Sequence, residues 1–273
     1  MIVKQGKVSH YVDGYLYRNL IFAKGLLRKD WDFCILIDGI EGSGKSIFGQ
    51  LVAWVLDSTI CLDRIVFTPK EFKEAVIKAE KFEAIIYDEA FGGLASRASL
   101  SEVNLSLVQM LAQVRQKNLC LIIIMPCLWE LDRYAAVWRS RMLLHCYTGK
   151  KWERGYFGFY SYEKKKELYF MGKKSFRYSV RPDFRGRFTG GYLVPEDAYR
   201  AKKFGALAGA EKGRFTRTDM RYDRHRSALV RFLKSEGYTE PEIAQAMGGT
   251  RAVINLILRK SRIEKEKAAQ LLS

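Results

Sequence analysis

Gly39-Ile40-Glu41-Gly42-Ser43-Gly44-Lys45-Ser46 is the stretch of this sequence that decides its fold. It matches the pattern G-x-x-x-x-G-K-[ST] and lies between an apolar run, Phe33 to Asp38, and an amphipathic stretch, Ile47 to Leu56. A strand, a glycine-rich turn and a helix in this order form a phosphate-binding loop, where backbone N–H groups and the positive end of the helix cradle phosphate groups. The sequence therefore predicts that residues 39–47, ending at Ile47, hold a nucleotide.

Two side chains of this loop carry the expected chemistry. Lys45 would reach the β- and γ-phosphates, and the Ser46 hydroxyl would ligate Mg²⁺. The glycines permit close approach of the backbone and unusual backbone dihedrals. We therefore expect ATP and Mg²⁺ as the bound cofactors.

A second apolar run, Ala84-Ile85-Ile86-Tyr87, ends in two acids, Asp88 and Glu89. We expect Asp88 to hold the magnesium shell and Glu89 to orient or deprotonate the attacking water. Paired acids at a strand end can also form a solvated turn, but their spacing from the loop is typical of the Walker B element. The pair favours hydrolysis by water over transfer of the phosphoryl group to a small molecule.

Short apolar runs alternate with helical stretches from Phe33 to Tyr147, which is the pattern of an α/β fold. Thr68-Pro69-Lys70-Glu71 supplies an N-cap, a proline in the first turn and a capping-box glutamate, and the stretch Ser101 to Lys117 is expected to be one long helix. Near-continuous apolar strands imply a parallel sheet covered on both faces. The strands are expected at 33–38, 64–67, 84–88, 119–125 and 142–147.

The order of these features carries a resemblance over residues 33–147. Phosphate loop, Asp88-Glu89, a helix ending in Arg115-Gln116-Lys117-Asn118, the strand Leu119 to Met125, then Leu131-Asp132 and Arg139 together resemble the FtsK-HerA superfamily of ring-forming DNA pumps. The same part is similar to the ATPase part of zonular occludens toxin-like phage assembly proteins. The superfamily includes chromosome translocases, conjugation motors and viral genome-packaging ATPases.

The resemblance implies a RecA-like sheet in which strand 119–125 inserts between the phosphate-loop strand and the Walker B strand. It also implies a hexameric or other ring, in which an arginine of one subunit reaches the γ-phosphate bound to the next. Arg97, Arg115, Arg139 and Arg141 are the candidates, and we favour Arg139 and Arg115. Members commonly end strand 119–125 with a polar γ-phosphate sensor, whereas this chain has Met125-Pro126-Cys127.

Positive charge is concentrated in the second half of the chain. The net charge is +17 overall, of which +2 belongs to residues 1–148, +9 to residues 149–205 and +6 to residues 206–262. Aromatic residues alternate with the basic ones over residues 149–205, which favours nucleic acid as a partner over a merely solubilising surface. We expect β-hairpins there, from short alternating runs at 155–160 and 167–171, and phosphate contacts from Lys164, Lys165 and Lys166.

The tail resembles a helix-turn-helix. Thr239 and Glu242 form a capping box, Gly248 suits the tight turn, and Thr250 caps the second helix. Ile243, Met247, Val253, Ile254, Ile257 and Leu258 are expected to share a small core with Leu229 and Leu233. We expect Thr250, Arg251, Ala252, Asn255 and Arg259 to contact DNA, although a helical hairpin used only for protein contacts fits the same pattern.

The five cysteines have no C-x-x-C spacing and predict buried thiols in a reducing cytoplasm. No signal peptide or membrane span is expected, so the predicted location is the cytoplasm, of the host cell if the chain is viral. The expected fold is a RecA-like P-loop NTPase with a basic, hairpin-rich extension and a small all-α tail. The expected parts are a segment of unknown role (1–30), the ATPase core (31–148), the extension (149–205), a linker (206–219) and the helix-turn-helix domain (220–273).

The interpretation that joins these features is a homo-oligomeric ATP-hydrolysing motor on double-stranded DNA, in packaging or transferring a viral or mobile-element genome. Viral capsid or transfer-apparatus proteins are possible partners. Two alternatives remain open. One is a DNA-bound ATP switch that recruits a recombinase or replication protein, and the other is a phage morphogenesis ATPase that acts on protein.

Overall fold

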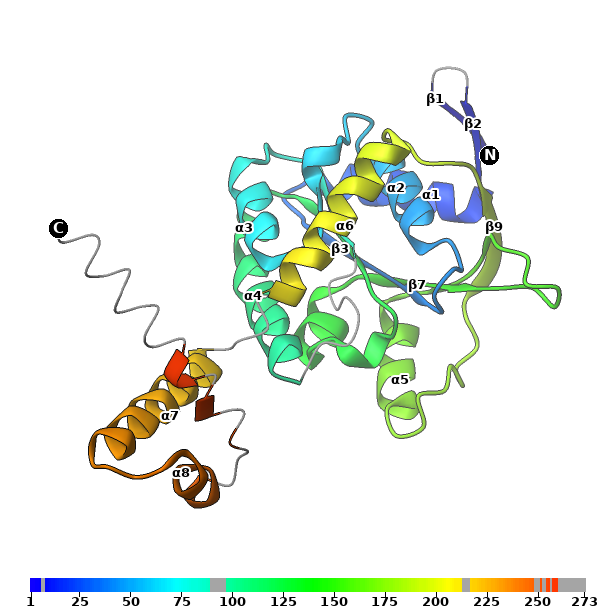
Figure 1. Ribbon diagram of the computed structural model, residues 1–273. Coiled ribbons are helices and arrows are strands. Elements are labelled where there is room, and N and C mark those ends of the chain that lie inside the picture. The colour runs from blue at the N-terminus through cyan, green and yellow to red at the C-terminus, as the bar shows by residue number, and fades with distance from the viewer. Residues whose placement is uncertain are drawn as a thin grey trace. The chain divides into compact units, whose positions relative to one another are not determined.

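The computed structural model describes residues 1–5, 8–88, 97–212, 217–247, 251, 254, 255 and 257–259 (Figure 1). The chain divides into two compact units, residues 1–207 and residues 208–273. None of the helices within the described residues combines the length and the apolar content needed to cross a bilayer.

The first unit is built on one nine-stranded sheet, in which one half is parallel and the other half is antiparallel. The strand order is β1-β2-β9-β8-β7-β3-β6-β5-β4, and the five strands from β7 to β4 run parallel to one another. All five lie where the apolar runs predicted strands: β3 (Phe33–Gly39), β4 (Ile65–Val66), β5 (Ala84–Tyr87), β6 (Cys120–Ile124) and β7 (Met142–Tyr147). β6 lies between β3 and β5, so the strand order expected from the resemblance is confirmed.

Helices cover both faces of the sheet (Figure 1). Successive residues of a strand point to opposite faces, and β3 accordingly supplies two separate cores. Ile35 and Ile37 pack with α1 (Gly14–Leu27) and α2 (Lys45–Leu56). Cys34 and Leu36 pack with α3 (Pro69–Lys78), α4 (Arg97–Gln116) and the π-helical turn η3 (Tyr134–Arg139). The predicted capping box of Thr68 and Glu71 is present at the start of α3.

The basic extension continues this same sheet. β7 and β8 (Tyr156–Tyr160) form an antiparallel hairpin, and β8 pairs with β9 (Phe184–Thr189). β9 then pairs with β2 (Val8–Val12), which pairs with β1 (Ile2–Gln5), so the first residues of the chain complete the sheet. Two short 3-10 turns, η1 (Leu62–Arg64) and η2 (Leu128–Glu130), connect elements of the parallel part.

The strand expected at 167–171 is wrong, because these residues belong to α5 (Tyr162–Gly172). The buried residues of α5 are Lys165, Leu168, Tyr169 and Gly172. Their spacing of three and four residues is that of one helix face. The helix expected at 195–204 is confirmed as α6 (Glu196–Lys212), and it continues through the first residues of the predicted linker.

The second unit contains α7 (Arg217–Ser235) and α8 (Glu240–Ala246), with residues 251, 254, 255 and 257–259 also helical. Its core is formed by Val230, Ile243, Ala244 and Ile254, with Leu233, Met247, Ile257 and Leu258 packed against it. Leu229, which we expected in this core, is 48% exposed, and its neighbour Val230 is buried instead. Val253 lies outside the described residues.

Three of the five thiols, those of Cys34, Cys120 and Cys146, are buried as expected. Cys61 is exposed and Cys127 is intermediate, so the prediction of buried thiols is wrong for Cys61. All five cysteines are free.

Candidate nucleotide site and the basic face around it

The predicted phosphate loop is a turn whose backbone requires glycine. Gly39, Gly42 and Gly44 have φ values of 136°, 77° and 96°, which side chains of L-residues disfavour. A Cβ atom on Gly39 would lie 2.1 Å from the carbonyl oxygen of Cys146 on β7. Gly44 is the N-cap of α2 and provides no side chain to cap it. The loop therefore leaves the N-terminal end of α2 open to an anion.

Lys45 spans this loop. Its amine donates hydrogen bonds to the carbonyl oxygens of Gly39 at 2.7 Å and Ile40 at 2.9 Å. Burial lowers the pKa of Lys45, while the nearby carboxyl groups of Asp38 and Asp88 oppose that shift. The amine thus lies at the loop, next to the end of β5.

The two expected magnesium ligands are brought together by a residue that the sequence did not single out. The Tyr199 hydroxyl, on α6, donates a hydrogen bond to Oδ2 of Asp88, and the Ser46 hydroxyl also hydrogen-bonds to Tyr199. Asp88 and Tyr199 are 1% and 2% exposed. Burial raises the pKa of Tyr199, and the neighbouring Asp88 carboxylate adds to the rise. The Tyr199 hydroxyl therefore bridges the side chains of Ser46 and Asp88.

Contacts on either side of Tyr199 hold α6 against the sheet. Lys202 donates to the carbonyl oxygens of Leu62 and Ile65, at 3.0 and 2.7 Å, and the backbone N–H of Leu193 donates to Gln50 of α2 at 2.9 Å. Cation contacts with backbone carbonyls are invisible to a motif search. A tyrosine among the charged residues at the start of α6 was the sequence signal for this contact.

Glu89, the expected water-orienting residue, lies outside the described residues, and so does the segment 90–96 that follows it. Thr250 and Ala252 of the expected DNA-contact set also lie outside them.

The arginine candidates have different environments. Arg139 pairs with Asp32 and donates to the Leu111 carbonyl at 2.9 Å, and its side chain is 12% exposed. Arg141 lies over the ring of Trp31, with its guanidinium carbon 5.2 Å from the ring centre. Arg115 is exposed near the end of α4. Arg139 thus has partners within its own subunit, whereas Arg115 faces solvent.

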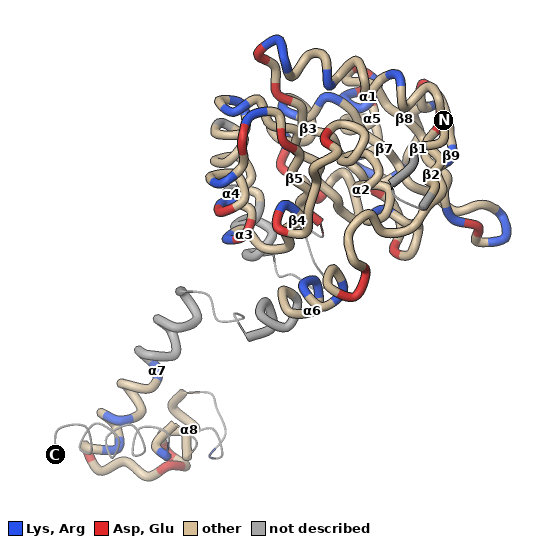
Figure 2. The backbone as a smooth tube through the Cα atoms, turned by 90° about the horizontal axis from the view of Figure 1, so that it is seen from above, with Lys and Arg blue, Asp and Glu red and all other residues tan. Residues whose placement is uncertain are grey.

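A further arginine, which the sequence did not single out, lies beside the phosphate loop. A Cβ atom on Gly42 would lie 3.9 Å from Nη2 of Arg154, which is an exposed residue of the loop between β7 and β8. Basic residues are spread around this unit and include that same loop (Figure 2). Phe188 of β9 lies beside the phosphate loop, because a Cβ atom on Gly44 would lie 3.4 Å from its ring, and it stacks on Phe48 of α2 with ring centres 4.1 Å apart. The basic extension therefore borders the predicted nucleotide site.

The lysine run 164–166 is mainly engaged within the fold. Lys165 is fully buried and donates to the carbonyl oxygens of Ala136 at 2.5 Å and Val137 at 3.1 Å. Lys164 lies 3.5 Å from a carboxylate oxygen of Asp183, and Lys166 lies over the Trp138 ring. The expectation that Lys165 contacts nucleic acid is wrong, because its amine is buried and hydrogen-bonded to backbone carbonyl oxygens of η3.

Asp38, the last side chain before the phosphate loop, is buried with three partners. Its carboxylate accepts from the Leu128 N–H at 3.1 Å and from the Tyr178 hydroxyl, and it lies 2.8 Å from Nδ1 of His145. Burial and the Asp38 charge raise the pKa of Tyr178. This cluster fixes the end of β3 to β7 and to the segment before β9.

In the second unit, the described members of the expected DNA-contact set are exposed. Arg251, Asn255 and Arg259 are four residues apart, so a helix places them on one face. Arg251 also lies 3.6 Å from a carboxylate oxygen of Glu240 at the start of α8. The predicted capping box of Thr239 and Glu242 is present there.

Comparison of the sequence with protein-family models and with curated proteins gives no match.

Proposed function

We propose that this chain is a P-loop ATPase with a RecA-like core that acts as a motor on duplex DNA. One observation carries the nucleotide part of the proposal. Ser46 and Asp88 share the Tyr199 hydroxyl beside a glycine loop that holds the Lys45 amine. Magnesium usually takes one or two protein ligands and completes its shell with water and phosphate oxygens, which suits a hydroxyl paired with one carboxylate.

The residues of the site have separate roles in this proposal. The glycine loop and the start of α2 bind the phosphates, and Lys45 turns from the loop carbonyls toward them. Ser46 and Asp88 would hold the metal ion. Glu89 orients the attacking water. Mg²⁺-ATP supplies the phosphoanhydride bond that is hydrolysed.

Two arginines are assigned by their surroundings. Arg154 lies beside Gly42 of the loop in the same subunit, and we assign it to a terminal phosphate. Arg115 is free to reach a neighbouring subunit in a ring, whereas Arg139 is held by Asp32. We therefore assign the trans role to Arg115.

DNA binding is supported by charge and by the tail. The net charge of residues 149–262 is about +15 at neutral pH, which attracts a polyanion. The tail is proposed to be a helix-turn-helix, on the basis of its capping box, its small core and the shared face of Arg251, Asn255 and Arg259.

The test measures ATP turnover with and without duplex DNA, alongside particle images of the assembly. A motor gives turnover that duplex DNA stimulates and that is lost in Lys45→Ala, together with ring-shaped particles. Turnover that stays silent until a protein partner is added favours a switch and contradicts the motor. Absence of ATP binding in the unaltered chain contradicts the ATPase assignment as a whole.

A further inference from the structure

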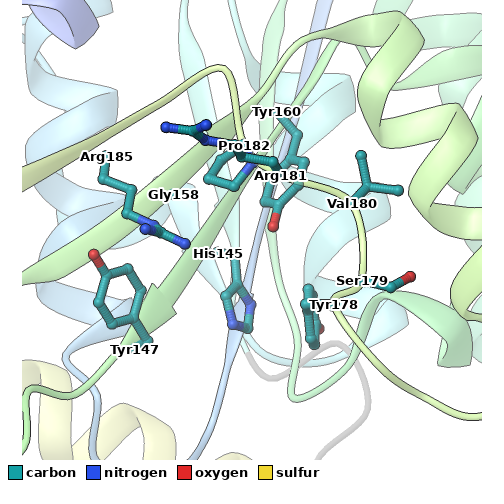
Figure 3. Close-up of a pocket in the computed structure, with 10 residues that line it drawn as sticks. All are labelled: His145, Tyr147, Gly158, Tyr160, Tyr178, Ser179, Val180, Arg181, Pro182 and Arg185. Carbon is teal, nitrogen blue, oxygen red and sulfur yellow. The ribbon is translucent and has the colours of Figure 1, made fainter.

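A cavity lies beside the Asp38 cluster, over the antiparallel strands of the sheet (Figure 3). Its volume is about 450 Å³, within the usual range of small-molecule sites of ~300–1,000 Å³. Its lining includes four rings and two guanidinium groups, from His145, Tyr147, Tyr160, Tyr178, Arg181 and Arg185. None of these residues belongs to the phosphate loop.

The strand register determines which residues of the sheet share the face on which the cavity lies. Asp38, His145, Gly158 and Arg185 occupy one row across β3, β7, β8 and β9, so their side-chain positions share one face. Gly158 provides no side chain in the middle of this row. Pro182 packs directly over this glycine, since a Cβ atom on Gly158 would lie 3.3 Å from the Pro182 ring. The cavity lies beside this contact and is flanked by tyrosines.

The rings around the cavity have fixed orientations. His145 stacks on Tyr178 with ring centres 3.7 Å apart and an angle of 26° between the planes. Asp38 hydrogen-bonds to both of these side chains from below. Tyr147, whose side chain is half-buried, stacks on Tyr156 at 5.8 Å. The aromatic wall is therefore formed before any ligand arrives, so little conformational entropy is lost when a flat molecule binds.

The charge in the cavity is positive at its open side. Arg181 and Arg185 are exposed, and in Figure 3 the Arg185 side chain extends from β9 toward His145 and Tyr147. The one carboxylate in the row, Asp38, is fully buried behind His145. Flat rings beside exposed guanidinium groups match a nucleotide, whose base stacks on aromatic side chains and whose phosphate pairs with arginine.

We propose that this cavity binds one unpaired nucleotide of a nucleic-acid strand, with the base against the aromatic wall and the phosphate at Arg181 and Arg185. A strand fits better than a free mononucleotide because residues 149–205 carry a net charge of +9, which extends the attraction to neighbouring phosphates. The inference goes beyond the proposed function, because it adds an unpaired strand to duplex DNA as a ligand of the first unit. It does not depend on ATP hydrolysis.

The experiment measures binding of a fluorescein-labelled oligothymidylate of about ten nucleotides by anisotropy, without ATP. Arg185→Gln is expected to weaken binding at least fivefold and to reduce the salt slope by ~0.7, the value for one phosphate contact on a single strand. Tyr147→Leu is expected to weaken binding about 5- to 150-fold, as for loss of one stacked base. Matched controls are Arg28→Gln and Tyr15→Leu, which alter exposed residues at the two ends of α1. Circular dichroism and thermal melting establish that each variant is folded.

Three outcomes overturn the inference. The first is equal binding by the cavity variants and their controls. The second is competition by thymidine monophosphate as strong as that by the oligonucleotide, which assigns the cavity to a free nucleotide. The third is an equal effect of Tyr147→Leu on a blunt duplex, which means that no unpaired base is held. If ATP turnover is absent but the cavity variants lose oligonucleotide binding, the ATPase proposal fails and this inference stands.

Discussion

Tyr199 on α6 donates a hydrogen bond to Asp88 at the end of β5, although the two residues are 111 positions apart in the chain. Asp88 is 1% exposed, and Ser46, the other expected magnesium ligand, hydrogen-bonds to the same hydroxyl. The first turn of α6 therefore meets the predicted metal ligands directly. Nucleotide binding and the position of α6 are linked through this one hydroxyl.

Replacing Tyr199 with phenylalanine removes this donor from a buried carboxylate. The free energy of unfolding without nucleotide is expected to fall by about 1–3 kcal/mol. The deficit should shrink when Mg²⁺-ATP is present, because a metal ion at Asp88 makes the lost donor unnecessary. Urea unfolding with and without Mg²⁺-ATP measures both values, and Tyr15→Phe, on an exposed tyrosine, is the control. An equal deficit in both conditions would contradict a metal role for Asp88.

Glu89→Gln should bind ATP but hydrolyse it at least ~100-fold more slowly, because the water-orienting acid is lost while the phosphate cradle survives. Lys45→Ala should lose binding as well. Binding of a fluorescent ATP analogue and phosphate release measure the two steps separately. Turnover near normal in Glu89→Gln would remove that residue from its role.

The two favoured arginines should now behave differently. Arg139→Ala deprives Asp32, which is 4% exposed, of its cation, and should lower the free energy of unfolding by about 3–5 kcal/mol. Arg115→Ala should fold normally and lose ATP turnover. Mixing Arg115→Ala with Lys45→Ala subunits should restore part of the turnover in mixed rings, since each contributes an intact half-site. Failure to restore any turnover, together with a fully active monomer, would refute a shared site.

Lys165 should give the first unit a pH-dependent stability above neutrality. Burial lowers its pKa to about 7, against ~10.4 in an unfolded chain. Between these values the unfolded state binds the extra proton, so the contribution of Lys165 to the free energy of unfolding rises with pH. Lys165→Met should abolish this rise, and Lys164→Met, at a residue that is 38% exposed, should keep it. Urea unfolding from pH 7 to pH 10 provides the comparison.

In the tail, Asn255 and Arg259 share an exposed face, but Asn255 is expected to contact bases and Arg259 is expected to contact phosphates. Arg259→Ala should weaken binding to all duplexes about equally and flatten the salt dependence by a slope of ~0.9. Asn255→Ala should weaken binding only to a preferred sequence. Binding titrations on a selected and a scrambled duplex at several salt concentrations separate the two effects. A uniform loss in both variants would assign Asn255 to phosphate contact.

The parallel strands were predictable because strands that are buried on both faces have continuous apolar sequences, as in Ala84 to Tyr87. Residues 167–171 were mispredicted because a short apolar run with two aromatic residues suits a buried strand as well as a helix. The helix face is fixed by the burial of Leu168 and Tyr169 and by the Lys165 amine, which donates to the Ala136 carbonyl 29 residues earlier.

The phosphate loop was predictable because its glycines and lysine act locally. The ion pair of Arg139 could not be predicted from sequence, since its partner Asp32 lies 107 residues earlier. Tyr199 and Arg154 were not identified for the same reason. Each residue reaches the site because elements that are distant in the sequence pack together. Neither residue belongs to a sequence motif.

The pairing of Tyr11 with Thr189 joins two strands that the ribosome makes at very different times. About 180 residues separate these partners, so a ribosome adding 5–20 residues per second needs roughly 10 to 40 s between them. During that interval β1 and β2 have only each other, and an isolated two-stranded hairpin is marginally stable. The β1–β2 hairpin therefore lacks its neighbour in the sheet until β9 has left the ribosome, and the nascent protein exposes a strand edge for that time.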